Sequence, residues 1–372
     1  MTLHASVDLL EGVDVLPIEC IDYLELYSGN AKQTAFYFCK LFGFDIIAYS
    51  GLETGNRERA SYVLAQGDIR LVISCAYQSD HPIAQFVHKK GDSIRDIAFR
   101  VKDLEDTYAK LLANGATPIQ PPTEEHDEHG VVKKATVAAF GDTVHTLIER
   151  EAYQGIFAPG YIEQFEKGSD TNTGIVAYDH LAVFVENNDE WAEFYDRVFG
   201  FKLLNSFSKD DISTERSSLM TKVSQNNNSR IKLPINSPAQ GKGRSQISEF
   251  MEYNAGPGIG HIAFLTHDIM ASIEHMQNNG LRFLYTPQSY YDLLPERVGE
   301  IDEPLDKLND LNVLVDRDDE GYLLQIFCHP VHDRPTLYFE LIQRKGSRGF
   351  GDGNIRALYE AMEREQAKRG NL

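Results

Sequence analysis

The sequence predicts an α+β protein built from two tandem copies of one unit, each a curled mixed β-sheet with helices on its outer side. Three observations favour this fold class. Short runs of alternating apolar and polar residues, typical of strands, are interspersed with amphipathic helical segments. One stretch of the chain is repeated 157 residues later, and a second stretch is repeated 165 residues later. Repeats of this kind indicate a duplicated structural unit.

The first repeated stretch reads as a strand, a polar turn and a helix. DYLELYSGN, which begins at Asp22, is matched by DHLAVFVEN, which begins at Asp179, at an offset of 179 − 22 = 157 residues. Each is followed by a helical segment that closes on Phe-Gly-Phe, beginning at Phe42 and at Phe199. Because these triplets have the same offset, no gap is needed between the two copies.

The second repeated stretch reads as an alternating strand followed by an amphipathic helix. SIRDIAFRVKDLEDTYAKLLANGATPIQPP is matched by GIGHIAFLTHDIMASIEHMQNNGLRFLYTP. Both helices are expected to end at Asn-Gly, at 114–115 and 279–280, where glycine supplies the left-handed conformation that stops a helix. Each half then closes on one more strand, VHTLIER ending at Arg150 and LYFELIQR ending at Arg344.

These repeats divide the chain into three parts. We expect an N-terminal domain over residues 1–150 and a C-terminal domain over residues 177–372. The intervening segment 151–176 contains Gly, Pro, Ser and Asp and is expected to be a linker.

The composition is that of a globular protein with an acidic surface. Apolar residues make up 42% and charged residues 25%, and 36 Lys and Arg against 56 Asp and Glu give a formal net charge of −20. Such a surface repels phosphate backbones and anionic lipid, so we expect neither nucleic acid nor a membrane as partner. No apolar run reaches the roughly 20 residues of a membrane-spanning helix. The first residues lack the basic-then-apolar order of a signal peptide, and we therefore expect a cytoplasmic protein.

Three polar positions change together between the two halves, while the hydrophobic frame around them is kept. The second half has two histidines and a glutamate where the first half has other residues: His180 for Tyr23, His261 for Asp96, and Glu340 for Thr146. Two histidines and one carboxylate form the set that leaves open positions on non-haem Fe(II) for substrate and O₂. Each of the three lies in a strand-like run, and a strand fixes the geometry of a ligand better than a loop.

Each of these residues taken alone has an ordinary interpretation. A single histidine in a strand is most often a hydrogen-bonded structural residue, and a single buried glutamate most often belongs to an ion pair. The coincidence of three changes at equivalent sites is what indicates a metal. The sequence therefore predicts one Fe²⁺ per chain at His180, His261 and Glu340. From ligand types alone, zinc or manganese is also compatible.

The other histidines and the cysteines do not predict a second site. Four histidines fall in an expected solvated loop or turn and three have no partner at useful spacing: His126 and His129, His329 and His332, and His145, His267 and His275. The four cysteines are far apart and lack a Cys-x-x-Cys motif, which argues against a disulfide framework and against a thiolate zinc site.

The duplicated plan is what the vicinal oxygen chelate superfamily looks like. Within it, the chain from about VLPIECIDYLELYSGNAKQ to its end resembles the 4-hydroxyphenylpyruvate dioxygenase family. The most specific stretches are KLPINSPAQGKGRSQISEF, TPQSYYDLLPER, GYLLQIF and FELIQRKGSRGFGDGNIRALYEAMEREQ. The sister enzyme family, the 4-hydroxymandelate synthases, shares the scaffold and the iron site.

The resemblance implies a set of site residues. At the positions of the family's iron ligands this sequence has His180, His261 and Glu340, the residues that the comparison of the two repeats also indicates. The substrate pocket of the family falls on eleven further positions: Thr221, Pro234, Asn236, Gln246, Gln325, Phe327, Tyr338, Phe350, Gly351, Asn354 and Ile355. Neutral amides can hold a phenol or a carboxylate, and a phenylalanine ring offers a flat apolar wall.

The C-terminal segment is expected to form a lid helix. GFGDGN precedes IRALYEAMEREQAKRG, which has helical periodicity and good helix formers. A glycine hinge before a helix is what a lid over an active site needs, although a glycine-rich stretch of this kind also fits a flexible loop.

Three positions depart from the usual dioxygenase pattern. Thr221 stands where the family has Ser, Gly260 where it has Gln, and Ile355 where it has a ring-stacking Phe. The isoleucine is the feature that the mandelate-forming enzymes show, whereas Pro234 and Asn236 are those of the homogentisate-forming enzymes. These departures concern substrate orientation and leave the iron ligands intact.

The resemblance also implies a reaction. An aromatic 2-oxo acid, 4-hydroxyphenylpyruvate, and O₂ would be converted to homogentisate and CO₂, as in tyrosine catabolism, with 4-hydroxymandelate as the alternative product. The substrate is its own reductant, so no cofactor beyond iron is expected, in agreement with the lack of a GxGxxG or P-loop motif. The N-terminal half is expected to be structural and to contribute to a homo-oligomer, either a dimer or a tetramer.

Two other functions have to be set against this one. A vestigial binding module would be expected to have lost at least one ligand in the second half, and none is missing. An extradiol ring-cleaving dioxygenase shares the fold and the ligands, but lacks the LPIN and GFGxGN elements seen here.

Overall fold

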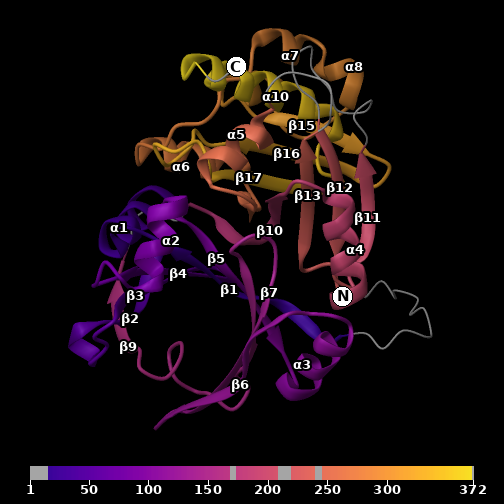
Figure 1. The fold of residues 1–372 in the computed structure, drawn as a ribbon. Helices are drawn as coiled ribbons and strands as arrows, with labels where there is room; N and C mark the ends of the chain where they lie inside the picture. Colours follow the sequence, from indigo (N-terminus) through magenta and orange to yellow (C-terminus); the bar gives the residue numbers. More distant parts are fainter. Residues whose placement is uncertain (1–15, 168–172, 208–218, 239–244, 371–372) are drawn as a thin grey trace, which may run out of the picture.

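Two curled sheets, one in each half of the chain, form the framework of the protein (Figure 1). The structure is a computed structural model that describes residues 16–167, 173–207, 219–238 and 245–370. In the N-terminal sheet the strands lie in the order β6-β7-β8-β5-β1-β4-β3-β2-β9. Their bounds are β1 Ile18–Tyr27, β2 Asp45–Ser50, β3 Arg59–Gln66, β4 Ile69–Ala76, β5 Ser93–Val101, β6 Pro118–Asp127, β7 Gly130–Ala138, β8 Val144–Glu149 and β9 Ile162–Glu166.

The C-terminal sheet repeats this order. Read from the equivalent edge it is β15-β16-β17-β14-β10-β13-β12-β11. Its strands are β10 Ile175–Phe184, β11 Lys202–Phe207, β12 Leu219–Gln225, β13 Lys232–Pro238, β14 Gly258–Thr266, β15 Leu314–Asp318, β16 Gly321–Phe327 and β17 Tyr338–Lys345. In both sheets the central strand runs antiparallel to one neighbour and parallel to the other, so the predicted duplication and the α+β fold class are confirmed.

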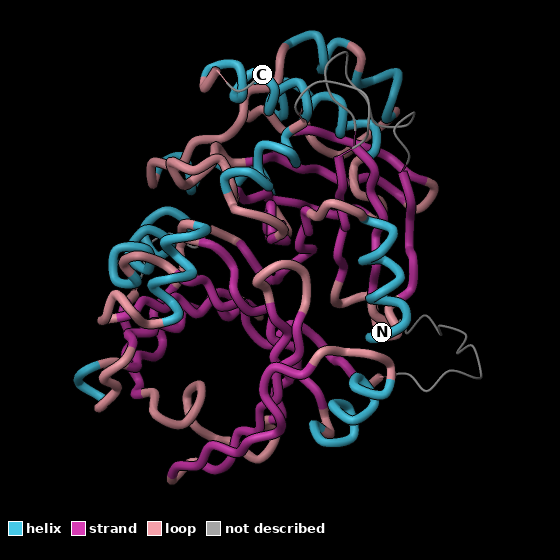
Figure 2. Tube along the Cα trace, in the orientation of Figure 1, coloured by secondary structure: helices cyan, strands magenta, loops and turns pink. Residues whose placement is uncertain are grey.

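Helices cover the strands of both halves (Figure 2). The N-terminal half has α1 Ala31–Phe42, α2 Pro82–Lys90 and α3 Leu104–Ala113, with a short 3₁₀ turn η1 at Leu52–Thr54. The C-terminal half has α4 Asn188–Phe199, α5 Gln246–Tyr253, α6 Ile269–Asn278, α7 Gln288–Asp292, α8 Leu294–Val298, α9 Leu305–Asp310 and α10 Asp352–Lys368. As the repeat predicts, α3 and α6 both end at Asn-Gly, with the glycines at φ 95° and 102°.

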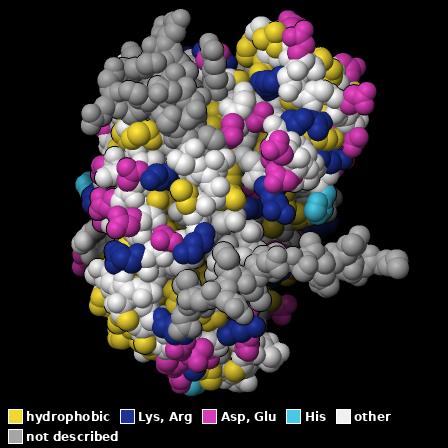
Figure 3. Space-filling view, turned by 90° about the vertical axis from the view of Figure 1, so that its right-hand side faces the viewer, with side chains coloured by type: hydrophobic (Ala, Val, Ile, Leu, Met, Phe, Trp, Pro, Cys, Tyr) yellow, Lys and Arg dark blue, Asp and Glu magenta, His cyan; other side chains and the backbone are white. Residues whose placement is uncertain are grey.

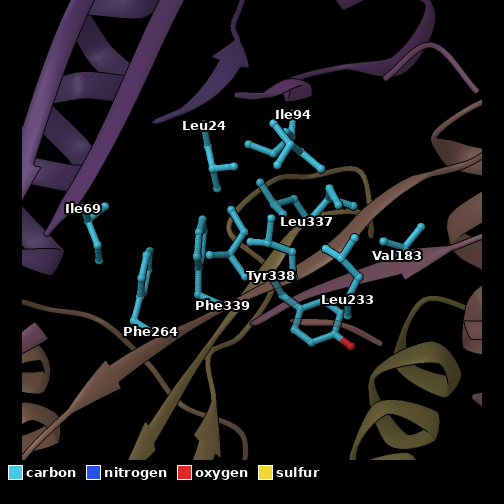
Figure 4. Close-up of a cluster of buried hydrophobic side chains, with 14 of the residues drawn as sticks. Leu24, Ile69, Ile94, Val183, Leu233, Phe264, Leu337, Tyr338 and Phe339 are labelled. Atoms are coloured by element: carbon cyan, nitrogen blue, oxygen red, sulfur yellow. The ribbon is translucent and has the colours of Figure 1, made fainter. Parts of the chain in front are cut away.

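A shared hydrophobic core joins the two halves (Figure 4). Leu24, Ile69 and Ile94 of the first half face a row of side chains of the second half that includes Phe264 and Phe339. Aromatic rings of α1 complete the contact, because the Phe42 ring lies 5.1 Å from that of Phe339, centroid to centroid. Burial of this apolar and aromatic surface stabilises the pairing of the halves.

Part of the segment expected to be a linker is packed against the N-terminal sheet. Strand β9 pairs antiparallel with β2 and forms the edge of the sheet, and residues 168–172 lie outside the described part. Upstream of β9, Phe157 and Ala158 are buried inside the N-terminal sheet beside Tyr23. This segment therefore packs against the first sheet at Tyr23, the repeat counterpart of His180 in the second half.

The surface agrees with the acidic composition. Acidic and basic side chains are interspersed on the face seen in Figure 3. The charged stretch around His126 and His129, expected to be a solvated loop, is instead the exposed hairpin of β6 and β7. Within the described residues no helix combines the length and the apolar character needed to cross a membrane.

Candidate metal centre

Three neighbouring strands bring the predicted ligands together. His180 is on β10, His261 on β14 and Glu340 on β17, which are adjacent in the sheet, so all three side chains reach the same concave face. The two Nε2 atoms lie 3.2 Å apart, and each lies 3.2 Å from Oε2 of Glu340. His180 and Glu340 are buried, and His261 is nearly so. His261 and Glu340 follow His180 by 81 and 160 positions in the sequence, yet one donor atom of each of the three residues lies in the same triangle.

The outward nitrogen of each imidazole is held by a neighbour. Nδ1 of His180 lies 2.7 Å from Oδ1 of Asp179, and Asp179 is itself bound by Arg344 through contacts of 2.6 and 2.8 Å. Burial alone would raise the pKa of Asp179, but its hydrogen bonds to Arg344 hold the pKa well below its ordinary value. Asp179 is therefore a carboxylate that accepts the Nδ1 proton, which leaves a lone pair on Nε2. His261 Nδ1 lies 3.1 Å from the Tyr338 hydroxyl.

This donor set fits a metal cation. Two imidazole nitrogens and a carboxylate oxygen point at one another at 3.2 Å in a buried site, an arrangement that a shared cation stabilises. Burial acts to raise the pKa of Glu340, but the two imidazoles outweigh it and keep the pKa below its usual range. A histidine whose second nitrogen donates to a carboxylate is the usual support of a metal ligand.

The equivalent place in the first half has no such set. The Tyr23 hydroxyl lies 3.4 Å from Asp96, and the backbone N–H of Thr146 donates to the other oxygen of Asp96 at 3.0 Å. Burial raises the pKa of Asp96 to about 7. The Phe157 ring packs on Tyr23, with ring centroids 5.6 Å apart.

Other acidic and histidine residues do not gather into a comparable site among the described residues. The cluster of Asp103, Glu105 and Glu149 is exposed and is bridged by Lys133. His145 is buried between the halves, where it contacts the Ile97 carbonyl and the Tyr195 hydroxyl. These two contacts indicate a structural role for His145.

A cavity of about 70 Å³ adjoins the three ligands. Ten of the eleven pocket residues implied by the resemblance line it: Thr221, Pro234, Asn236, Gln246, Gln325, Phe327, Tyr338, Phe350, Asn354 and Ile355. Gly351 does not line it. At φ 78° this glycine lies behind Gln325, where a Cβ atom would overlap the amide oxygen. Its contribution is to let the start of α10 approach Gln325 closely.

A chain of hydrogen bonds links α10 to the carboxylate ligand. Gln325 Nε2 donates to Oε1 of Glu340 at 3.1 Å, and Asn354 Nδ2 donates to Oε1 of Gln325 at 3.1 Å. On the other side, Asn354 Oδ1 accepts from the Tyr290 hydroxyl at 2.6 Å and from Arg297 at 2.9 Å. These bonds fix the orientation of both amides at the cavity wall.

Two cavity residues, Phe184 and Leu358, were missed by the sequence analysis. Phe184 lies on the same strand and the same face as His180, four residues on, and its ring occupies the space next to Gly260. A Cβ atom at position 260 would lie 2.5 Å from this ring. The unusual glycine at position 260 could have indicated that a bulky side chain occupies the space beside this position. Leu358 lies one helical turn after Asn354, which helical periodicity could have shown.

Comparison with known proteins gives a consistent result. Residues 15–158 match the family model described as hydroxyphenylpyruvate dioxygenase, N-terminal, and residues 177–326 match that of the glyoxalase/bleomycin resistance protein/dioxygenase superfamily. A 4-hydroxyphenylpyruvate dioxygenase from Yarrowia lipolytica is 39% identical, over 94% of this chain and 93% of the relative. One from Caenorhabditis briggsae is 40% identical, over 99% and 97%.

A solved structure extends this similarity to the fold. A triply substituted 4-hydroxymandelate synthase from Streptomyces coelicolor superposes with a TM-score of 0.83 at 35% identity, covering 94% of this chain and all of that one. The similarity in sequence spans both domains and almost the full length of the relatives. The chain therefore belongs to the 4-hydroxyphenylpyruvate dioxygenase family.

Proposed function

We propose that this protein is an Fe(II)-dependent dioxygenase that converts 4-hydroxyphenylpyruvate and O₂ to homogentisate and CO₂. The observation that carries the proposal is the buried triangle of His180, His261 and Glu340 beside an amide- and phenylalanine-lined cavity. The membership of the family supports the substrate and the choice of iron. A ferrous ion held by this set would supply Lewis-acid activation of the 2-oxo acid and electrons for dioxygen.

The side chains of the cavity would orient the substrate. Phe327 and Phe350 give the aromatic ring flat walls, and Gln325 and Asn354 present amides in fixed orientations. Asn236 is similarly fixed, because the Thr221 hydroxyl donates to its Oδ1 at 2.7 Å. Threonine therefore supplies the hydroxyl that the family's serine would supply.

Helix α10 would act as the lid. Its approach segment carries Phe350, whose ring packs on His180 at 5.2 Å and lies under the Arg344 guanidinium at 5.5 Å. The cavity of about 70 Å³ is well below the roughly 300 Å³ of small-ligand sites. Entry of a substituted benzene ring therefore requires α10 to move, and its return would exclude water from the reacting atoms.

The test is reconstitution of the purified chain with Fe(II) under anaerobic conditions, followed by substrate, O₂ and chromatography of the products. We expect one iron per chain and homogentisate as the main product, with some 4-hydroxymandelate because Ile355 replaces an aromatic wall. Glu340→Ala should lose iron and turnover. Thr146→Ala, at the equivalent position of the first half, should keep both. Exclusive formation of 4-hydroxymandelate, or iron retained by Glu340→Ala, would contradict the proposal.

We propose further that the N-terminal half is structural and supports a homo-oligomer. Large apolar side chains are exposed near the free edge of its sheet, with Phe36 66% and Phe165 68% exposed on α1 and β9. Exposed apolar groups beside an edge strand are typical of contact surfaces. Phe165→Lys should lower the mass measured by sedimentation velocity, and an unchanged mass would argue against this surface.

We also place the protein in the cytoplasm. Its four cysteines are unpaired, which fits a reducing compartment. Fractionation of cells that express the full chain tests this location.

A further inference from the structure

A second, larger cavity is lined by residues of both halves. Its volume is about 540 Å³, and every residue that lines it from one half has its repeat counterpart in the lining from the other half. Asp22 corresponds to Asp179 at the offset of 157 residues. Strand register relates Arg70 at the start of β4 to Lys232 at the start of β13, at an offset of 232 − 70 = 162. The cavity thus presents one cation from each half at equivalent places.

The two carboxylates of this cavity that are buried are already neutralised. Asp22 is bound by Arg100 at 2.7 Å and by Arg150 at 2.6 Å. Asp179 is bound by Arg344 at 2.6 Å and also holds His180. Among the described residues, the direct ion pairs of these two carboxylates with arginine and lysine therefore go to Arg100, Arg150 and Arg344, and to no other cation of the lining.

Three cations of the lining have no such partner. Arg70, Arg230 and Lys232 make no ion pair with any carboxylate of the described residues. Within the part of the chain that the structure describes, the Arg70 guanidinium donates to the carbonyls of Gly67 and Ile69. One exposed carboxylate, Asp68, is left in the lining to oppose these three charges. Burial lowers the pKa of Arg70 and of Lys232, and the nearby carboxylates Asp22 and Asp179 offset this effect only in part.

We propose that this cavity binds a small dianion, with one anionic group on Arg70 of the first half and the other on Lys232 of the second. The volume lies within the range of small-ligand sites, and unpaired, partly desolvated cations are the groups that bind carboxylate or phosphate oxygens. A ligand that bridges the halves favours the folded, paired arrangement over the unfolded chain. It would also lie beside Asp179, the carboxylate that orients His180.

Thermal unfolding of the iron-loaded full chain tests this site. The probes are succinate as a dicarboxylate and inorganic pyrophosphate as a phosphate, each titrated at constant ionic strength against sodium chloride. We expect a saturable rise in Tm with at least one probe, and the responding probe identifies the chemical class. Iron content is measured after each titration, so that loss of metal to pyrophosphate is recognised.

The variants decide whether the response comes from this cavity. Arg70→Gln and Lys232→Gln should each weaken the apparent affinity by about tenfold or more, because each removes a charge-assisted contact. Lys232→Arg keeps the charge and should retain affinity. Lys222→Gln removes a lysine that pairs with Asp189 outside the cavity and should bind like the unmodified protein. No saturable response to either probe, or equal responses in all four variants, would overturn the proposal.

Discussion

Gly260→Ala tests whether the ring of Phe184 sets the shape of the substrate cavity. Gly260 precedes His261 on β14 and faces the Phe184 ring, three atoms of which would lie 2.5, 2.6 and 2.7 Å from an added Cβ. The ring must therefore move. On its other side it packs on Phe250, with centroids 5.1 Å apart, and Phe250 is fully buried. The free direction for movement is into the cavity of about 70 Å³.

The size of the effect follows from this crowding. Overpacking by one methyl group in a rigid core costs about 1–3 kcal/mol. We expect the free energy of unfolding to fall by up to that amount, and kcat/KM to fall by about five- to 150-fold where the displaced ring blocks the substrate. Iron content should be unchanged, because the strand that carries His261 keeps its register.

Urea unfolding, steady-state kinetics and iron analysis measure these three quantities. The double variant Phe184→Leu, Gly260→Ala should recover part of the loss, and the coupling energy of the two sites should exceed 0.5 kcal/mol in a double-mutant cycle. Gly29→Ala is the matched control, since a Cβ there would lie 3.8 Å from its nearest neighbour. Wild-type kinetics for Gly260→Ala, or strictly additive effects in the cycle, would refute the reasoning.

Two further substitutions test the supports of the site, and a third tests the equivalent place in the first half. Asp179→Asn removes the acceptor of the His180 Nδ1 proton, and metal affinity measured against a chelator should fall by about 10- to 100-fold; an unchanged affinity would mean that Asp179 does not support the ligand. Asn354→Leu breaks the chain from α10 to Gln325, so we expect faster hydrogen exchange in α10 and less product per O₂ consumed, with iron retained; fully coupled turnover would argue against the lid. Asp96 has a pKa of about 7, raised by burial from the ordinary 3.8, so folding favours its protonated form and stability is lost as pH rises from 4 through 7. Asp96→Asn, which cannot ionise, should therefore be more stable than wild type at pH 8 by up to roughly 4 kcal/mol and about equal to it at pH 4, as measured by urea unfolding; the same difference at both pH values would contradict the assignment.

The duplicated architecture could be predicted because its signals are local. Strand alternation, the Asn-Gly ends of α3 and α6, and the order of elements are all encoded in short stretches of sequence, and each stretch occurs twice. Two sheets with the same strand order follow from that repetition. The repeat also predicted the three ligand positions. At the positions equivalent to His180, His261 and Glu340 the first half has other residues, and this difference between the two copies indicated the ligands.

What the sequence could not determine depends on contacts between distant residues that share no local pattern. Packing of the Phe184 ring against Gly260 joins positions 76 residues apart, and the pairing of Asp179 with Arg344 joins positions 165 apart. Likewise, the segment around Phe157 has the composition of a linker, yet it packs against the first sheet. Side-chain volume and charge are balanced only once the strands have brought these groups together, so close packing in three dimensions decided the shape of the cavity and the supports of its ligands.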